Sequence, residues 1–439
     1  MAEENGILSI LNSNSLTGEI TVPGDKSISH RAIMLGSLAK GITEIKGFLR
    51  GEDALATVSA FRKMGIKINE YEEGLIEIHG QGLYGLNKSK TPIDLGNSGT
   101  SMRLLAGILT GQKFDSELVG DKSLSRRPMR RIALPLEKLG GVIKTSAQGT
   151  PPLFIAGNKS LKGTKIELKI ASAQIKSSLL LAGLYADGSV QITEPMKTRD
   201  HTERMLKAFG YDIEQRGNTV KIKGGGLLKN CFLNIPGDIS SAAFFIVAAS
   251  IIPGSDLLLK NIGINPTRIG IIKILKLMGA SIKILHQREI SGELVADIRV
   301  KSALLKGIRV PISLVPISID EFPVLFVAAA CASGTTVVEG AEELRVKESD
   351  RIQSMVSGLG KIGVTIEDTP DGAIILGGGQ DFFFSGGEVE AADDHRVAMA
   401  LAIAGLRCEN PLQINGCQNI ATSFPGFVSL GRSIGMEIS

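Results

Sequence analysis

The chain carries the sequence VPGDKS at Val22–Ser27, where a proline and a Gly-Asp turn come directly before a run of apolar residues. Almost the same order returns at Ile235–Ser240, with the sequence IPGDIS. Aspartate is a favoured N-cap, and the apolar residues that follow each turn have helical spacing. Both segments therefore predict the beginning of a helix, and their similarity predicts a repeated structure.

Four further Gly-, Ser- or Asp-rich turns open apolar helices, and the openings recur roughly every 65 to 80 residues. The six openings lie at residues 24–31, 96–100, 171–174, 236–241, 318–321 and 393–396. Each unit closes with a helix, a glycine and an alternating strand, at 64–68, 139–143, 209–213, 278–282, 362–366 and 434–438. Any α/β chain repeats such features, but here their order recurs as well as their composition, which favours six true repeats of an α/β (α+β) fold.

The length and composition limit the class of protein. At 439 residues the chain exceeds one ordinary hydrophobic core, so two domains are expected. With 43% hydrophobic residues, 21% charged residues and 52 glycines, the composition is typical of a turn-rich globular protein rather than a disordered or fibrous one. Apolar stretches such as Phe322–Ala332 are too short to cross a bilayer. Met1–Asn5 is acidic and unlike a targeting signal, so we expect a cytoplasmic protein without a membrane partner.

Neither a metal site nor a disulfide framework is predicted, because the cysteines have no CxxC spacing and no nearby histidine pair. We expect buried free thiols at Cys231, Cys331, Cys408 and Cys417. The formal net charge of +4 suits small anions or nucleic acid alike. Because the chain lacks tryptophan, has four tyrosines and has no long Lys/Arg run, the pattern favours small anions as ligands.

The first helix opening has the residues of an anion site. A helix N-terminus presents unpaired N–H groups and a partial positive charge, so several such ends with added cations can bind phosphates and carboxylates. Lys26 stands at this helix mouth, and Ser27 and Arg31 lie four residues apart on one face. The buried face is predicted to be Ile28, Ala32, Leu35 and Ala39. The alternative is a Ser cap with solvated charges.

The second opening is ambiguous. Either Asn97 or Ser98 can cap the helix that follows. The buried stripe of that helix is predicted to be Met102, Leu105, Ala106 and Leu109. Gly99 can let a ligand approach the backbone closely, or it can simply supply a positive φ angle in a tight turn.

The sequence RVKESDR places Lys347 and Arg351 four residues apart, which predicts one helical face with Glu348 beside it. A carboxylate among cations keeps its charge and can act as a base, or as an acid if burial raises its pKa. The alternative is a surface helix with ion pairs. Asp394–Arg396 and Ser172–Gln174 are likewise either anion contacts or only helix caps.

Together these motifs resemble the 5-enolpyruvylshikimate-3-phosphate (EPSP) synthase family over essentially the full chain. The motifs that carry the resemblance are Gly24–Ser27 with Arg31, Asn97–Thr100 with Arg103, Arg127-Pro128, Ser172–Gln174, Arg345–Arg351 and Asp394–Arg396. The resemblance implies an enzyme that transfers the enolpyruvyl group of phosphoenolpyruvate to the 5-hydroxyl of shikimate 3-phosphate and releases phosphate. The reaction serves the pathway to chorismate and the aromatic amino acids, and the family needs no metal or organic cofactor.

The family fold is a two-domain inside-out α/β barrel built from six βαβαββ repeats. The resemblance implies one domain of residues 1–22 plus 238–439 and an inserted domain of residues 23–237, with the active site in the cleft between them. A monomer is expected, and glyphosate is expected as an inhibitor at the phosphoenolpyruvate site. No nucleic-acid partner is expected.

The resemblance also implies roles for individual residues. Asp320 takes the proton from the attacking hydroxyl, Glu348 protonates the enol carbon, and Lys26 completes the catalytic set. The implied contacts of shikimate 3-phosphate are Ser27, Arg31, Ser172, Ala173 (through its backbone), Gln174, Arg199, Asp320 and Lys347. The implied contacts of phosphoenolpyruvate are Lys26, Asn97, Gly99, Arg127, Gln174, Arg351, His395 and Arg396.

The sequence departs from the commonest family pattern at three positions. Leu104 stands where many members have Pro, and Ala173 replaces a second Ser. Thr422 stands where many members place a phosphoenolpyruvate-binding Lys, so one cationic contact is missing from the expected set.

Three alternative functions are less favoured. The sister enzyme that transfers enolpyruvate to UDP-N-acetylglucosamine carries a reactive Cys before an Arg-Pro pair, and Gly120–Pro128 has none. A non-catalytic anion-binding protein of the same fold would not need Lys26, Asp320 and Glu348, which are all intact. A nucleotide-phosphate hydrolase is disfavoured because Gly24–Ser27 lacks the glycine spacing of a P-loop.

Overall fold

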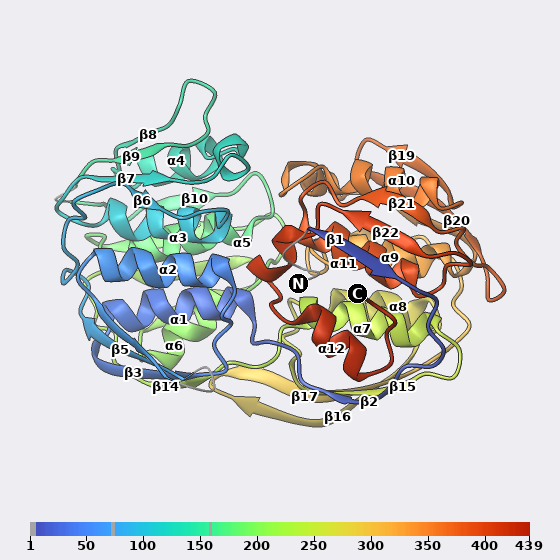
Figure 1. Ribbon diagram of the computed structural model, residues 1–439. Coiled ribbons are helices and arrows are strands. Elements are labelled where there is room, and N and C mark those ends of the chain that lie inside the picture. Colours follow the sequence, from blue (N-terminus) through green and yellow to red (C-terminus); the bar gives the residue numbers. More distant parts are fainter. Residues whose placement is uncertain (1–5, 72–74, 158–159) are drawn as a thin grey trace. The chain divides into compact units, whose positions relative to one another are not determined.

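The computed structural model describes residues 6–71, 75–157 and 160–439, and it has a mixed α/β architecture in which helices pack against small sheets (Figure 1). The described residues form twelve α-helices and six sheets. They divide into two compact units. Unit 1 consists of the chain up to Pro23, Pro236–Glu289 and Leu294–Ser439, and unit 2 consists of Gly24–Ile235 and Ile290–Glu293.

Unit 2 contains three successive pairs of helices and three four-stranded sheets. Its helices are α1 (Lys26–Leu38), α2 (Glu52–Lys63), α3 (Gly99–Thr110), α4 (Arg130–Glu137), α5 (Ala173–Gly183) and α6 (His201–Ala208). Its strands are β3 (Lys40–Lys46), β4 (Lys67–Glu70), β5 (Ile76–Gln81), β6 (Ile93–Asp94), β7 (Ser116–Val119), β8 (Ile143–Lys144), β9 (Leu153–Ile155), β10 (Lys165–Glu167), β11 (Ser189–Thr193), β12 (Ile213–Arg216), β13 (Thr219–Lys223) and β14 (Phe232–Asn234).

Unit 1 also has three pairs of helices, with one four-stranded and two three-stranded sheets. Its helices are α7 (Ile239–Ile251), α8 (Gly270–Leu277), α9 (Phe322–Ala330), α10 (Arg351–Lys361), α11 (His395–Gly405) and α12 (Phe427–Ser433). Its strands are β1 (Ile7–Ile10), β2 (Thr17–Ile20), β15 (Asp256–Gly263), β16 (Ser281–Ile290), β17 (Glu293–Lys301), β18 (Ser333–Val338), β19 (Thr365–Thr369), β20 (Gly372–Gly378), β21 (Gly387–Glu390) and β22 (Leu412–Asn415). The turn between β16 and β17 groups with unit 2.

The sheets share one pairing pattern. In unit 2 the strand orders are β14-β3-β5-β4, β6-β7-β9-β8 and β10-β11-β13-β12, with the first pair parallel and the other two antiparallel in each. In unit 1, β15 likewise pairs in parallel with β2 and antiparallel with β17. This recurrence confirms the predicted repeats, and it shows that an edge strand can come from a distant part of the chain.

Each of the six predicted openings begins a helix. In five of these six helices the N-cap side chain accepts a backbone N–H of the first turn, and these caps are Asp25, Ser98, Ser172, Asp238 and Asp394. The glycines that end the second helix of each repeat all have a positive φ angle, which residues with a side chain rarely adopt. The predicted last strand, 434–438, is wrong, because this segment makes only an isolated bridge from Ile438 to Ile10.

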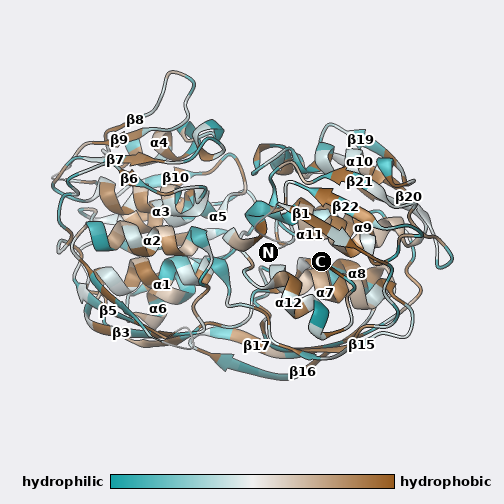
Figure 2. Ribbon diagram, in the orientation of Figure 1, coloured by the Kyte–Doolittle hydropathy of each residue, from teal (hydrophilic) through white to brown (hydrophobic). Residues whose placement is uncertain are grey.

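Each unit has its own hydrophobic core. Every residue of α7, α9 and α11 is buried, and the apolar α9 is mostly brown in Figure 2. The predicted buried faces of α1 and α3 are confirmed, because Ile28, Ala32, Leu35, Ala39, Met102, Leu105, Ala106 and Leu109 are all buried. The residues of α1, α3 and α5 that stay partly exposed all lie in the first turn: Lys26, Ser27, Thr100, Ala173 and Gln174. These three helices can therefore meet a ligand only at their N-termini.

The cysteines are free thiols, of which Cys331, Cys408 and Cys417 are buried as predicted, whereas Cys231 is only partly buried. Burial raises the pKa of Cys231 to about 11 and that of each other thiol to about 12. Across the described residues, no helix combines the length and apolar character needed to span a membrane.

Candidate active site

The mouth of α1 holds the candidate residue Lys26 in a fixed position. Asp25 caps the helix by accepting the Ile28 backbone N–H at 2.9 Å. The Lys26 Nζ atom lies 2.9 Å from Asp53 Oδ2 on α2, so the ammonium is held at the helix mouth by an ion pair. The sequence analysis missed Asp53, because an acidic residue in the first turn of a helix is expected simply from the helix dipole.

Arg31 is buried and hydrogen-bonded on three sides, so the alternative of solvated charges is wrong for this residue. Its Nη1 atom donates to the Ser27 carbonyl oxygen at 2.9 Å, which places Ser27 and Arg31 together as predicted. Its Nε atom donates to Thr202 Oγ1 at 2.7 Å and its Nη2 atom to Ser177 Oγ at 2.8 Å. The guanidinium is thereby fixed by α1, α5 and α6 together.

The mouth of α3 resolves the ambiguity of the second opening. Ser98 rather than Asn97 is the N-cap, since Ser98 Oγ accepts the Ser101 N–H at 3.3 Å. The Asn97 side chain instead accepts a hydrogen bond from Arg127 Nη2 and donates one to Asp121 Oδ2 at 2.8 Å. Asn97 therefore holds the guanidinium of Arg127, which is 6% exposed, beside this helix mouth.

Gly99 is the first residue of α3 and does not have a positive φ angle, so the simple-turn alternative is wrong; the positive φ of this turn, +54°, belongs to Gly96. A Cβ atom at Gly99 would lie 2.9 Å from Arg127 Nη1. The absence of a side chain therefore leaves room for the guanidinium of Arg127 close to the helix backbone.

The mouths of α3 and α5 are joined through Gln174. Its Oε1 atom accepts a hydrogen bond from Arg103 Nη1, and its Nε2 atom donates to Thr100 Oγ1 at 3.1 Å. Ser172 caps α5 by accepting the Ile175 N–H at 3.4 Å, and Ala173 is the first helical residue. The segment Ser172–Gln174 can therefore act as a helix cap and also contact an anion.

In unit 1 the candidate residues converge on one buried arginine. Arg351, 2% exposed, donates from Nε to Asp394 Oδ2 at 2.8 Å and from Nη2 to Glu348 Oε2 at 2.6 Å. Its Nη1 atom lies 3.4 Å from Asp320 Oδ1, and Lys347 Nζ lies 3.4 Å from the same oxygen. We call Asp320, Lys347, Glu348, Arg351 and Asp394 the Arg351 cluster.

The electrostatics of the Arg351 cluster keep its central cation charged. Burial alone would lower the pKa of Arg351, but the attraction of Asp394, Glu348 and Asp320 raises it above the ordinary value. Three carboxylates, those of Asp320, Glu348 and Asp394, surround this permanent cation. The cluster therefore brings together two carboxylates suited to proton transfer, Asp320 and Glu348.

The helical face predicted for Lys347 and Arg351 is wrong, although the two side chains do meet. Asp350 is an N-cap and α10 begins at Arg351, so Lys347 lies before the helix, directly after the 3₁₀ turn Glu342–Val346. The two cations meet at Asp320, which comes from the segment before α9. The surface-helix alternative is also wrong, because Arg351 and Asp394 are buried.

Arg396 and His395 open α11 and are 8% and 4% exposed. Arg396 Nη1 donates to the Asp320 carbonyl oxygen at 3.0 Å and lies 3.9 Å from Glu321 Oε1. Glu321, which sequence reasoning missed, is buried and also accepts a hydrogen bond from Ser240. The sequence signal that could have identified Glu321 as a site residue is its position next to Asp320.

The departures from the family pattern have local explanations. Leu104 is fully buried in the core of unit 2, so it offers no ligand contact. The Thr422 hydroxyl donates to the Asn419 carbonyl oxygen at 2.6 Å, and the residue is buried. A threonine at this position supplies no cation. The described residues contain no group of three His, Cys, Asp or Glu side chains placed to hold a metal ion.

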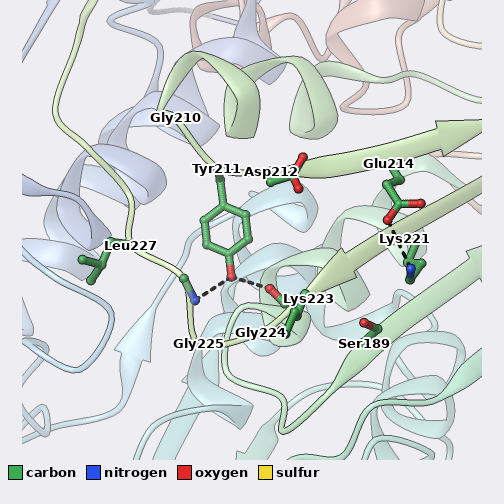
Figure 3. Close-up of a pocket in the computed structure, with 11 residues that line it drawn as sticks. Ser189, Gly210, Tyr211, Asp212, Glu214, Lys221, Lys223, Gly224, Gly225 and Leu227 are labelled. Carbon is green, nitrogen blue, oxygen red and sulfur yellow. Dashed lines mark hydrogen bonds and ion pairs between the residues drawn. The ribbon is translucent and has the colours of Figure 1, made fainter.

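A separate hollow of about 440 Å³ lies beside β12 and β13 and contains none of the candidate residues (Figure 3). Tyr211 points into it, but its hydroxyl donates to the Lys223 carbonyl oxygen at 2.7 Å and accepts the Gly226 N–H at 3.1 Å. Lys221 is paired with Glu214 at 3.1 Å. These polar groups satisfy one another, so the hollow lacks the convergent groups of the helix mouths.

Comparison with known proteins gives matches along the whole chain. The family model of EPSP synthase (3-phosphoshikimate 1-carboxyvinyltransferase) matches residues 10–430. The 3-phosphoshikimate 1-carboxyvinyltransferase of Methylococcus capsulatus is 57% identical over 423 residues, which cover 96% of each chain. A solved EPSP synthase from Acinetobacter baumannii has a TM-score of 0.88 at 53% identity, with 99% of each chain covered.

The enolpyruvyl transferase NikO from Streptomyces tendae shares only the fold, with a TM-score of 0.79 at 16% identity over 99% of this chain and 98% of that one. These likenesses confirm the expected two-domain inside-out α/β fold. With a family model matched from residue 10 to residue 430 and a relative at 57% identity, the chain belongs to the EPSP synthase (3-phosphoshikimate 1-carboxyvinyltransferase) family.

Proposed function

We propose that this chain transfers the enolpyruvyl group of phosphoenolpyruvate to the 5-hydroxyl of shikimate 3-phosphate through Asp320, Glu348 and Lys26. The observation that carries the proposal is the Arg351 cluster, in which one buried cation holds both Asp320 and Glu348. As a member of its family the chain is a transferase of the shikimate pathway, which leads to chorismate and the aromatic amino acids.

The chemistry requires an acid and a base in the same place. Addition of the hydroxyl to C2 of phosphoenolpyruvate needs a proton at C3, while the hydroxyl must lose its own proton. In this proposal Asp320 accepts the hydroxyl proton and Glu348 delivers a proton to C3. When phosphate leaves, Glu348 takes a proton back from the new methyl group, and the proton held by Asp320 leaves with the phosphate. Lys26 and the arginines stabilise the tetrahedral adduct, which still carries phosphate and carboxylate groups.

The substrate contacts divide between the two units. We assign shikimate 3-phosphate to Ser27, Arg31, Ser172, Ala173, Gln174 and Arg199 of unit 2, with Asp320 and Lys347 of unit 1. We assign phosphoenolpyruvate to Lys26, Asn97, Gly99, Arg127 and Gln174 of unit 2, with Arg351, His395 and Arg396 of unit 1. The partly exposed first turns of α1, α3 and α5 support the unit 2 assignments, because the rest of each helix is buried.

We further propose a cytoplasmic monomer that glyphosate inhibits at the phosphoenolpyruvate site. The clustering of cations at the helix mouths supports binding of a small dianionic inhibitor there. The alternative function is transfer of enolpyruvate to UDP-N-acetylglucosamine, and an assay with that acceptor tests it directly.

Phosphorus NMR of the purified chain with phosphoenolpyruvate and shikimate 3-phosphate tests the reaction. We expect both substrate signals to fall, and inorganic phosphate to rise in equal amount with one new phosphate ester. An unchanged spectrum over hours at micromolar enzyme would overturn the proposal.

A further inference from the structure

A buried ionic cluster in unit 2 has no part in the proposed chemistry. Lys176 on α5 places its Nζ atom 2.8 Å from Glu194 Oε2 and 2.8 Å from Glu203 Oε1. The side chains of all three residues are at most 2% exposed. We call Lys176, Glu194, Glu203 and Thr198 the Lys176 cluster. Burying charges is costly unless each is paired. The pairing within the cluster therefore indicates that it holds the segments that carry these residues in one arrangement.

The Lys176 cluster anchors the chain between β11 and α6. The Thr198 hydroxyl donates to Glu194 Oε1, and Lys176 Nζ lies 3.4 Å from the Thr198 carbonyl oxygen. The preceding residues 195–197 are exposed, whereas Thr198 is 3% exposed. The chain therefore leaves the surface at Thr198 and is fixed there.

The next anchor follows two residues later. Asp200 is 5% exposed, and its Oδ1 atom accepts a hydrogen bond from Arg204 Nε at 2.9 Å. Arg199, the proposed shikimate 3-phosphate contact on this segment, lies between Thr198 and Asp200. Its backbone is thus held on both sides.

Helices α5 and α6, which carry Lys176 and Glu203, also fix Arg31. The hydroxyls of Ser177 and Thr202 hold the Arg31 guanidinium. In the sequence Ser177 directly follows Lys176, and Thr202 directly precedes Glu203. Thr202 Oγ1 lies 2.7 Å from Ser177 Oγ, so α5 and α6 meet at this point. The ion pairs of Lys176 therefore lie next to the hydrogen bonds that orient Arg31.

The ammonium of Lys176 stays charged in spite of its burial. Burial alone would lower the pKa of Lys176, but the attraction of Glu203 and Glu194 raises it. Burial raises the pKa of Glu203. The ammonium therefore remains available to hold Glu194, and through Glu194 the Thr198 hydroxyl.

We infer that the Lys176 cluster is a positioning element for shikimate 3-phosphate, and that Thr198 transmits its effect by fixing the backbone that carries Arg199. This inference rests on the proposed function. A long side chain on an ordered backbone loses less freedom on binding, so anchoring the segment in advance strengthens binding without a new contact to the substrate.

The test compares Thr198→Val with Thr198→Ser. Valine has the shape of threonine but cannot bind Glu194, whereas serine keeps the hydroxyl. We expect Thr198→Val to raise KM for shikimate 3-phosphate about tenfold, with kcat and KM for phosphoenolpyruvate unchanged, because one hydrogen bond to a carboxylate is lost. Thr198→Ser should restore KM to within about twofold of wild type. A Thr198→Val enzyme with wild-type KM would overturn the inference.

Thr43→Val is the matched control. Thr43 on β3 is a fully buried threonine of the same unit, and its hydroxyl has no hydrogen-bond partner among the described residues. The same chemical change there should leave both KM values unchanged. An equal rise of KM in Thr43→Val would show that any buried Thr→Val change loosens unit 2, which contradicts a specific role for Thr198.

A double-mutant cycle with Arg199→Ala tests the route of the effect. If Thr198 acts through Arg199, Thr198→Val should not raise KM further once Arg199 is alanine. Multiplicative effects of the two changes would contradict transmission through Arg199.

Amide hydrogen exchange of the substrate-free enzyme separates this inference from the proposed function. Exchange at residues 196–199 should be faster in Thr198→Val than in wild type or Thr198→Ser. An inactive wild-type enzyme would overturn the proposed function. An active wild type whose Thr198→Val variant keeps the wild-type KM for shikimate 3-phosphate, or the wild-type exchange rates, would overturn this inference alone.

Discussion

At the scale of single residues, Arg351 links the groups that the reaction needs. It binds Glu348, Asp320 and Asp394 from three separate segments, and it is itself buried. Removing one partner of a buried charged pair leaves the other without compensation, which is strongly destabilising. Replacing Arg351 therefore affects both the structure and the catalysis. Replacing Glu348 by Gln can keep the hydrogen bond to Arg351 and remove only the proton transfer.

Glu348→Gln tests the proton donor. Glutamine keeps the shape and can still accept the hydrogen bond from Arg351, but it cannot transfer a proton. We expect kcat to fall by about 10² to 10⁴ fold while shikimate 3-phosphate still binds. Steady-state kinetics and calorimetric binding check this, with the exposed Glu342→Gln as control. Unchanged kcat would remove Glu348 from the mechanism.

Arg127→Ala and Arg396→Ala test the division of the substrates. Each variant should weaken phosphoenolpyruvate binding by roughly 1.5 to 3 kcal/mol per lost charged hydrogen bond, and shikimate 3-phosphate binding by less. Arg351→Ala should do the same and also lower the melting temperature, because Asp394 loses its partner. The exposed neighbour Arg126→Ala is the control for Arg127. Equal weakening of both substrates would show that the sites are divided wrongly.

Gly99→Ala tests the close approach at the mouth of α3. The new Cβ would meet Arg127 Nη1 at 2.9 Å, so that guanidinium must shift away from the helix mouth where it is proposed to bind phosphoenolpyruvate. The longer glyphosate should lose more affinity than the substrate, by roughly 1 to 3 kcal/mol. Gly360→Ala, where a Cβ meets nothing within 4 Å, should change neither constant. A Gly99→Ala enzyme with an unchanged ratio of the glyphosate inhibition constant to KM would contradict the steric explanation.

At the scale of elements, a buried hydrogen-bond network joins α1, α2 and α3. His30 Nδ1 lies 2.7 Å from Thr57 Oγ1, which lies 2.6 Å from Ser101 Oγ. Ser98, the cap of α3, lies 2.7 Å from Ser101 Oγ. Burial, with further contributions from Lys26 and Arg31, lowers the pKa of His30 well below 6.5. The histidine is therefore neutral in the folded chain.

His30→Asn tests this charge state. In the folded chain His30 binds a proton only well below pH 6.5, whereas in the unfolded chain it does so near pH 6.5, so falling pH favours unfolding. Stability from this residue is present above pH 6.5 and is lost below it. Between pH 7 and pH 5.5 the wild type should lose about 1 kcal/mol more than His30→Asn. Urea unfolding at the two values measures the difference, and parallel losses in both proteins would contradict a neutral His30.

Local signals explain how much of the fold was predictable. The caps Asp25 and Asp394 act on backbone groups two or three residues away, so the sequence alone places these helix starts. For α3 the sequence left Asn97 and Ser98 as alternatives, and the structure shows that Ser98 is the cap. The repeated order of turn, helix and strand then predicts the six units. The pairing of β14 with β3 is a contact between residues far apart in the chain, and no local pattern signals it.

The site was less predictable, for a physical reason. Spacing placed Lys347 and Arg351 on one helix, but Asp350 starts the helix later, and only the fold brings both side chains to Asp320. Lys176 carries a charge, and lysine usually lies at the surface, yet this side chain is fully buried. Whether a charge is buried depends on which elements pack over it, and that information is not local.

At the scale of the whole molecule, the two units contribute different parts of the proposed reaction. Unit 2 provides the helix mouths with Lys26 and Arg31, and unit 1 provides both carboxylates of the Arg351 cluster. Neither unit alone carries the full set of proposed groups, so the activity is assigned to the complete chain.

The most direct test of the central claim is the rate of phosphate release from phosphoenolpyruvate with two different acceptors. One reaction contains shikimate 3-phosphate and the other UDP-N-acetylglucosamine, at equal enzyme and phosphoenolpyruvate. We predict rapid release with shikimate 3-phosphate and release no faster than without acceptor in the other tube. Release only with UDP-N-acetylglucosamine would contradict the account.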